Sequence, residues 1–153
     1  MADAAAHSGL LDPGVLLAAA HARPPAPGTK KSLWVADHVR AAAESPLESL
    51  ARATVVLAGL PEPTPQVRIR TRAGVFRADL LDEANRTIIE ADGKLKYLAP
   101  EDLWREKRRE DALRECGFEV VRFTMYDYHH PHPWLHIYRR ALARGALLPP
   151  WLG

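Results

Sequence analysis

The segment from Val75 to Asp92 reads VFRADLLDEANRTIIEAD and predicts two adjacent antiparallel strands. Apolar and β-branched side chains fill its two arms, and Asp82-Glu83-Ala84-Asn85 between them has the composition of a turn. An acid interrupts each arm, at Asp79 and at Glu90. Acidic residues are depleted in strands, so these two positions require an explanation beyond secondary structure.

The two acids can be direct cross-strand partners. The pairs would then be Asp79 with Glu90, Leu81 with Ile88 and Asp82 with Thr87. Directly opposed residues point to the same face of a sheet, with Cβ atoms roughly 5 Å apart. A shift of the register by one residue would put Asp79 and Glu90 on opposite faces.

A third carboxylate follows on the same strand. Because side chains alternate between the faces of a strand, Asp92 shares the face of Glu90. We therefore expect three carboxylates to converge, although like charges opposite one another destabilise a sheet. A hard divalent cation would resolve this repulsion, since such ions prefer oxygen ligands.

Helix and strand signals surround this hairpin. Helices are predicted from Ser45-Pro46 to Gly59, over about 101–115 and over about 133–144, together with a shorter one over about 13–22. Further strands are predicted from Val67 to Arg72 and over 118–124. From residue 44 onward the order is α-β-β-β-α-β-α. This order indicates the α/β (α+β) class, a mixed sheet flanked by helices.

The composition fits one globular domain. The chain has 153 residues, is 47% hydrophobic and 26% charged, and carries a net charge of +2. We expect an N-terminal helical and linker segment over 1–43, the main domain over 44–147 and a tail over 148–153. One cysteine, Cys116, and the lack of an apolar run long enough for a membrane span favour a reducing, cytoplasmic setting without a membrane partner.

Several motifs occur in a characteristic order. They are Ser45-x-x-Glu48, Gln66, Arg77-x-Asp79, Ile89-Glu90-x-Asp92-Gly93, Glu106-x-x-Arg109 and Gly117-x-x-Val120-x-Arg122-Phe123-Thr124. Over about residues 44–143 this order resembles the PD-(D/E)XK nuclease superfamily, in the branch near very-short-patch-repair endonucleases. The resemblance implies a restriction-endonuclease-like fold. In longer relatives this domain follows a winged-helix-like region, and residues 1–43 look like the end of such a region.

The resemblance also implies a site. Asp79 and Glu90, with Asp92, would hold Mg²⁺ or Mn²⁺, and Glu48 would reach the metal directly or through water. Gln66 lies on the first strand, near the position at which the relatives carry a polar site residue. The superfamily's lysine position is occupied here by Asp92, so Lys96, or else Lys94, would replace that lysine.

The implied activity is metal-dependent hydrolysis of phosphodiester bonds, with DNA as the expected substrate. Arg68 and Arg70, with Arg72, alternate with apolar residues along the first strand and could follow a phosphate backbone. The aspartate in the lysine position equally allows a catalytically inactive nucleic-acid-binding or toxin–antitoxin-type regulatory module. A protein-interaction domain with ordinary surface acids is the third alternative.

Structural explanations exist for most of these residues. Glu48 can complete a capping box with Ser45, and Asp92-Gly93 can form the turn that ends a strand. The lysines and the arginine face can be solvated, as can the helix of mixed charge over 101–115. The cluster Tyr128-His129-His130-Pro131-His132 is predicted as a loop rather than a zinc site, and Trp104 and Trp134 as core residues.

Overall fold

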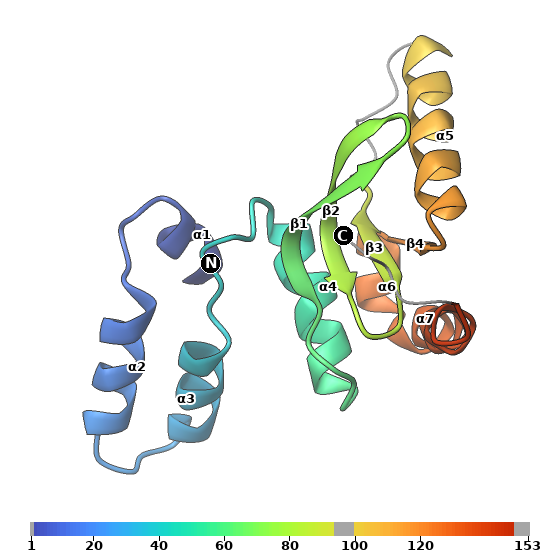
Figure 1. Cartoon of the computed structure of the whole chain (residues 1–153). Helices are drawn as coiled ribbons and strands as arrows, with labels where there is room; N and C mark the ends of the chain where they lie inside the picture. Colours follow the sequence, from blue (N-terminus) through green and yellow to red (C-terminus); the bar gives the residue numbers. More distant parts are fainter. Residues whose placement is uncertain (1, 94–99, 149–153) are drawn as a thin grey trace. The chain divides into compact units, whose positions relative to one another are not determined.

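A computed structural model describes residues 2–93 and 100–148 of the chain (Figure 1). The chain divides into two compact units, Met1–Pro46 and Leu47–Gly153. No helix within the described ranges is long and apolar enough to cross a membrane.

The first unit contains three short helices, α1 (Ala2–His7), α2 (Pro13–Ala22) and α3 (Thr29–Asp37). The prediction of a helix over 13–22 is confirmed, whereas α1 and α3 were not predicted. Asp12 caps α2, because its Oδ1 accepts a hydrogen bond of 2.9 Å from the amide of Val15. The buried Asp3 joins α1 to the segment after α3 by accepting a hydrogen bond of 3.0 Å from the amide of Arg40.

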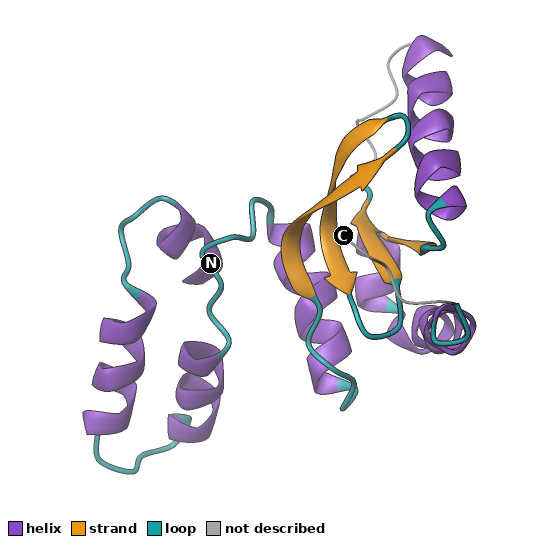
Figure 2. Cartoon of the chain, viewed as in Figure 1, coloured by secondary structure: helices purple, strands orange, loops and turns teal. Residues whose placement is uncertain are grey.

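The second unit is a mixed sheet flanked by helices (Figure 2). Its elements are α4 (Pro46–Leu57), β1 (Thr64–Thr71), β2 (Gly74–Asp82), β3 (Thr87–Ala91), α5 (Pro100–Glu115), β4 (Glu119–Phe123), α6 (Met125–His129) and α7 (Pro131–Gly145). The strand order is β1-β2-β3-β4. The first three strands are antiparallel, and α5 makes the crossover to the parallel strand β4. The expected class and element order are confirmed, with α6 as an additional short helix.

The hairpin register agrees with the expectation from the sequence. Leu81 pairs with Ile88 and Asp82 with Thr87. The carboxylate of Asp82 accepts hydrogen bonds from the backbone and side-chain nitrogens of Asn85, at 2.9 and 3.0 Å, and so fixes the turn.

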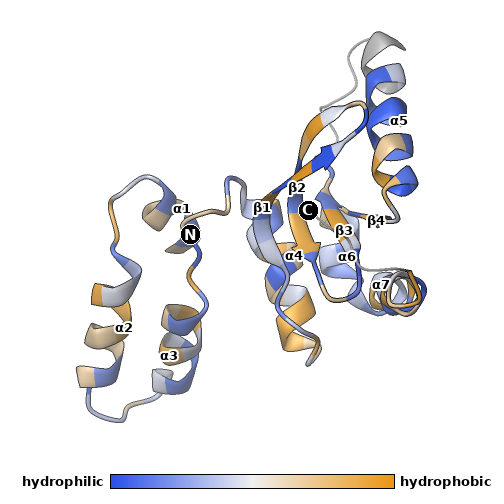
Figure 3. Ribbon diagram, viewed as in Figure 1, coloured by the Kyte–Doolittle hydropathy of each residue, from blue (hydrophilic) through white to orange (hydrophobic). Residues whose placement is uncertain are grey.

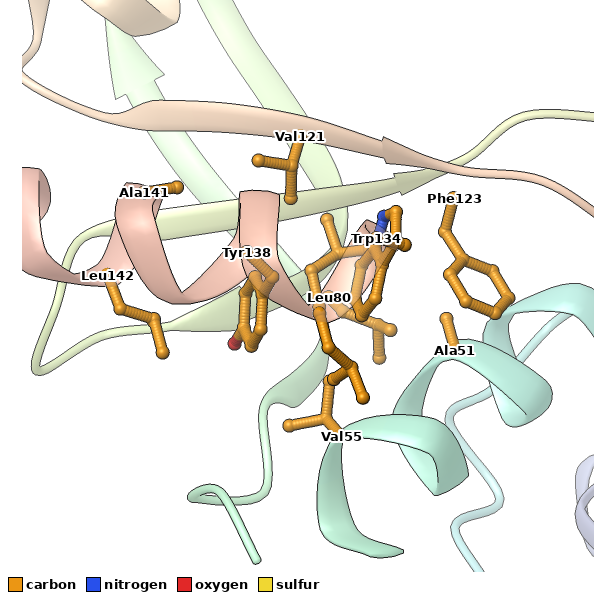
Figure 4. Packing of buried hydrophobic residues seen from close by; sticks show 11 residues of the cluster. Ala51, Val55, Leu80, Val121, Phe123, Trp134, Tyr138, Ala141 and Leu142 are labelled. Carbon is orange, nitrogen blue, oxygen red and sulfur yellow. The ribbon is translucent and has the colours of Figure 1, made fainter. Parts of the chain in front are cut away.

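Each face of the sheet has its own hydrophobic core. Leu80 and Ile89 point to the side covered by α4 and α7, where Trp134 and Tyr138 stack with ring centroids 5.1 Å apart (Figure 4). Leu81, Ile88 and their neighbours pack instead against α5 through Leu113. In Figure 3 hydrophobic segments are seen in β2 and β3, whereas α5 is largely hydrophilic.

The two tryptophans predicted as core residues differ. Trp134 is 2% exposed, and its Nε1 donates a hydrogen bond of 2.6 Å to the carbonyl of Arg122. Trp104 is 63% exposed, so the prediction for it is wrong. Its ring lies on α5 with the ammonium of Lys107 6.0 Å from the ring centroid. The sequence period of a helix does not by itself say which of its faces meets the sheet.

Candidate active site

Three polar residues of the predicted site form one row across neighbouring strands. The register of β1 with β2 puts Gln66 opposite Asp79. The pairs on either side, Pro65 with Leu80 and Val67 with Ala78, are regular, but Gln66 and Asp79 do not form a regular pair themselves. The register of β2 with β3, continued by one residue, puts Asp79 opposite Glu90. The sheet therefore brings together Gln66, Asp79 and Glu90.

The strands are irregular at this row. Ala78 and Leu80 are two residues apart, yet they pack into the cores on opposite faces of the sheet. A regular strand would place them on the same face. Gln66 has φ +58°, a left-handed conformation that costs a non-glycine residue energy and is often found at functional sites.

Asp79 reaches across to β3 from this irregular position. Its Oδ2 accepts a hydrogen bond of 2.8 Å from the backbone amide of Ala91. The carboxylate of Asp79 thus lies beside the residue that follows Glu90. The negative charge of Asp79 is also close enough to raise the pKa of Glu90.

Glu90 is a buried carboxylate, with an exposed fraction of only 6%. Its Oε2 lies 2.6 Å from Nη2 of Arg109, which comes from α5. Its Oε1 is buried and has no hydrogen-bond partner among the described residues. Burial raises the pKa of Glu90 to about 7, although the positive charge of Arg109 opposes this change.

Arg109 is fixed by several groups at once. Besides its ion pair with Glu90, its Nε lies 3.3 Å from Oε2 of Glu106, and its Nη1 donates a hydrogen bond of 3.4 Å to the carbonyl of Arg77. Burial lowers the pKa of Arg109, but Glu90 and Glu106 outweigh this effect and raise it overall. The guanidinium is therefore a permanent positive charge at the site.

Asp92 lies just beyond β3 and belongs to a second ion-pair group. Its amide donates a hydrogen bond of 2.9 Å to the carbonyl of Phe123, which holds it beside β4. Its Oδ2 is 3.7 Å from Nη1 of Arg122, and its Oδ1 is buried without a hydrogen-bond partner in the described part of the chain. Arg122 also lies 3.6 Å from Glu106 and 3.2 Å from Glu110.

The expectation that three carboxylates converge is wrong for the residues that the structure describes. Among the side chains that the structure describes, those of residues 2–93 and 104–148, no three histidine, cysteine or acidic groups form a set that could hold a metal ion. The physical reason is that Glu90 and Asp92 each have an arginine of their own. Arg109 balances the first carboxylate, and Arg122 lies near the second.

Glu48 approaches the row from α4. It is 5% exposed, and its Oε2 accepts a hydrogen bond of 2.8 Å from Nε2 of Gln66. The oxygen of that amide, Oε1 of Gln66, is buried and lacks a hydrogen-bond donor among the described residues. The structure thus links Glu48 to the row through Gln66.

The predicted cations occupy different places. Lys94 and Lys96 lie outside the described residues. Arg68 and Arg70 are exposed on β1 and make no ion pair within the described part of the chain. Arg68 pairs across the hairpin with Arg77, so two like charges face each other on the exposed side of the hairpin.

The histidine cluster is not a loop. Its first histidine, His129, ends α6, and Pro131 begins α7, so the prediction of a loop is wrong. Thr124 and Asp127 form a capping box that starts α6. The ring of His130 stacks on Tyr126 at 4.4 Å. No zinc-binding group is found among these residues or elsewhere in the described ranges.

The sequence predicted no site role for Glu106 and Arg109, although the motif Glu106-x-x-Arg109 was part of the resemblance. It predicted that the helix of mixed charge is solvated, but the side chain of Arg109 is only 23% exposed. A usable signal was present, because Glu106 and Arg109 are three residues apart and so share one side of the helix.

Comparisons with protein-family models, curated proteins and solved structures gave no match for this chain. The resemblance to PD-(D/E)XK nucleases therefore stays a prediction from the motifs.

Proposed function

We propose that the chain is a metal-dependent endonuclease-like domain that hydrolyses phosphodiester bonds, with DNA as the substrate. The observation that carries this proposal is a set of buried acceptor oxygens at the predicted site. Within the described ranges, Oε1 of Gln66, Oε1 of Glu90 and Oδ1 of Asp92 are all buried without a hydrogen-bond donor. Each such oxygen costs stability unless a donor or a cation approaches it.

The donor set suits Mg²⁺ or Mn²⁺, because these ions take oxygen ligands and commonly use only one or two carboxylates from the protein. Asp79 and Glu90 would be the carboxylate ligands, and Gln66 occupies the neighbouring position of the same row on β1. When bound, the ion would polarise the scissile phosphate and lower the pKa of an attacking water. Glu48 would orient Gln66 through their hydrogen bond of 2.8 Å.

The cation that assists the reaction is assigned to Lys96, or else Lys94, in the connection between β3 and α5. This part of the proposal rests on the sequence alone. A lysine there would stabilise negative charge on the phosphate or orient the water.

The exposed arginines of the β1–β2 hairpin would hold the substrate backbone. Arg77 comes two residues before Asp79 on β2 and faces Arg68, so this positive surface begins next to the row. Arg70 extends it toward the hairpin turn. A phosphate backbone could lie along this positive surface.

A catalytically inactive nucleic-acid-binding or toxin–antitoxin-type regulatory module is the second candidate. It is favoured by the ion pair between Glu90 and Arg109 and by the proximity of Asp92 to Arg122, at 2.6 and 3.7 Å. A protein that uses these acids only for structure would need no metal. Such a module would bind nucleic acid through the hairpin arginines without cleaving it.

One experiment separates the two candidates. Supercoiled plasmid and single-stranded DNA are incubated with the chain and Mg²⁺ or Mn²⁺, for the native protein, Asp79→Asn and the matched control Asp111→Asn on the exposed side of α5. We expect the native protein and the control to nick DNA and Asp79→Asn to be slower by roughly 100-fold or more. Equal rates for all three would refute the site. Salt-dependent binding without cleavage would support the second candidate.

We further propose a cytoplasmic location. The single cysteine, Cys116, is free in the structure and gives no sign of a disulfide framework. A nuclease acting on DNA would also be expected in this compartment.

A further inference from the structure

Arg109 holds only one of the two carboxylate oxygens of Glu90. The contact of 2.6 Å joins Nη2 of Arg109 to Oε2, while Oε1 is buried without a partner among the described residues. A carboxylate that is only 6% exposed requires a nearby positive charge, because burying an ion without compensation is costly. Arg109 supplies that charge.

A second carboxylate is already within reach of the same guanidinium. Oε2 of Glu106 lies 3.3 Å from Nε of Arg109. The side chain of Glu106 is 26% exposed, whereas that of Glu90 is 8% exposed. Glu106 and Arg109 share one side of α5, three residues apart. A small rotation of the Arg109 side chain would therefore exchange one carboxylate for the other without leaving the guanidinium unpaired.

We propose that Arg109 is a resident counter-ion that competes with the divalent metal for Glu90, and that Glu106 receives the guanidinium when the metal binds. This inference rests on the proposed metal site. A divalent cation bound to Glu90 would repel the adjacent guanidinium strongly, because this interior screens charges poorly. Metal binding therefore includes the release of Arg109 from Oε2 of Glu90.

The neighbouring charges favour this exchange. Arg122 contacts both Glu106 and Glu110, at 3.6 and 3.2 Å. When Glu106 takes Arg109, Glu110 can keep Arg122 in place. The site thus regulates its own loading, since the metal must outcompete an attached cation.

The test measures binding of Mn²⁺ alone to the full chain, from the electron paramagnetic resonance signal of the free ion. The variant is Arg109→Gln, and the matched control is Arg144→Gln, which removes an ion pair of the same 2.6 Å length with Glu119 on α7 and β4. We expect Arg109→Gln to lower the half-saturating Mn²⁺ concentration about tenfold or more, because a competing charge is gone. The control should leave it unchanged. A variant that merely damages the structure would weaken binding instead.

Glu106→Gln is the second variant and predicts the opposite change. Without Glu106 the guanidinium has no second carboxylate, so the half-saturating concentration should rise about threefold or more. This variant decides the question if Arg109→Gln fails to fold. Unchanged or tighter binding by Glu106→Gln would then overturn the inference.

The outcomes also separate this inference from the proposed function. If Asp79→Asn abolishes Mn²⁺ binding while Arg109→Gln binds as the native protein or more weakly, the counter-ion role is wrong and the metal site stands. Binding by Arg109→Gln but not by the native protein would support both. The lack of binding by either protein would overturn both.

Discussion

The carboxylate of Asp79 accepts a hydrogen bond of 2.8 Å from the backbone amide of Ala91. The regular pairs of β2 with β3 end one residue earlier, at Leu80 with Ile89. A side chain therefore joins the two strands where the backbone ladder stops. Asp79 has a structural contact as well as the proposed role in metal binding, and substitutions can separate the two.

Asparagine at position 79 should keep this contact, whereas alanine should lose it. Asp79→Asn retains an acceptor oxygen, so its free energy of unfolding should exceed that of Asp79→Ala by about 1 kcal/mol. Urea denaturation of both variants measures the difference. Equal stability of the two would show that the bond to Ala91 contributes nothing. Both variants should bind the metal more weakly, since each removes the negative charge of a carboxylate ligand.

The buried carboxyl of Glu90 should make stability depend on pH. Its pKa is raised from 4.5 to about 7, so between these values the folded state keeps a proton that the unfolded state has lost. The stabilisation is present below about pH 4.5 and is lost as the pH rises to about 7, with a total change of about 3 kcal/mol.

Glu90→Gln cannot titrate at this position. As the pH rises from 5 to 8, the unfolding free energy of the native protein should therefore fall relative to that of Glu90→Gln. Urea denaturation of both proteins at each pH measures this difference. Glu115→Gln, an exposed position near the end of α5, serves as the control and should follow the native protein. A difference between native protein and Glu90→Gln that stays constant with pH would contradict the raised pKa.

The two tryptophans should differ in their effect on stability. Trp134→Ala removes a ring that stacks on Tyr138 and meets the edge of Phe123 at 4.8 Å, so it should cost about 3–5 kcal/mol. Trp104→Ala is the matched control, and its 63% exposed ring should cost less than about 1 kcal/mol. Thermal or urea unfolding gives both values. A comparable loss for the two would mean that α5 presents another face to the sheet.

Gly145 should not tolerate a side chain. A Cβ there would lie 1.8 Å from the carbonyl oxygen of Asn85, and a backbone carbonyl cannot easily move away. Gly145→Ala should therefore destabilise the protein by about 1–3 kcal/mol or more, although alanine normally favours a helix. At Gly93 an added Cβ meets no atom of the described residues within 4 Å, so Gly93→Ala is the control. Unfolding of the two variants in urea should show a loss for the first alone.

The hairpin arginines should determine how DNA binding responds to salt. If Arg68 and Arg70 each contact a phosphate, replacing both with glutamine should reduce the slope of log K against log salt by about 2 for duplex DNA. Replacing the exposed Arg139 and Arg140 of α7 removes the same charge elsewhere and should leave the slope nearly unchanged. Fluorescence anisotropy at several salt concentrations measures both. Equal slopes for the two double variants would indicate binding by net charge alone.

The sequence predicted the hairpin in detail because its information is local. Period-two alternation and a turn at Asp82–Asn85 are enough to fix the register, and the pair of Leu81 with Ile88 follows from them. Helix limits were predictable to within a few residues from caps, prolines and glycines. The place of Asp79 opposite Glu90 follows from the same register. The place of Gln66 opposite Asp79 depends on the separate register of β1 with β2, which was not predicted.

The partners of the acids were not predictable in this way. Glu90 and Arg109 are far apart in the sequence, and their contact exists only because α5 packs on one face of the sheet. By alternation Asp92 was expected on the same face of the strand as Glu90, but its place beside β4 brings it near Arg122. Sequence periodicity gives the face of a strand or helix, but it does not give the distance between two elements.

The sequence by itself determined the order of the main elements from α4 to α7 apart from α6, the register of β2 with β3 and the placing of two acids opposite each other. Short-range sterics and the alternation of side chains decide these features. Only the tertiary structure decided which arginine neutralises which carboxylate and which oxygens stay without a donor. Those outcomes depend on the packing of α5 and β4, because the electrostatic energy of a buried charge is set by its neighbours in space.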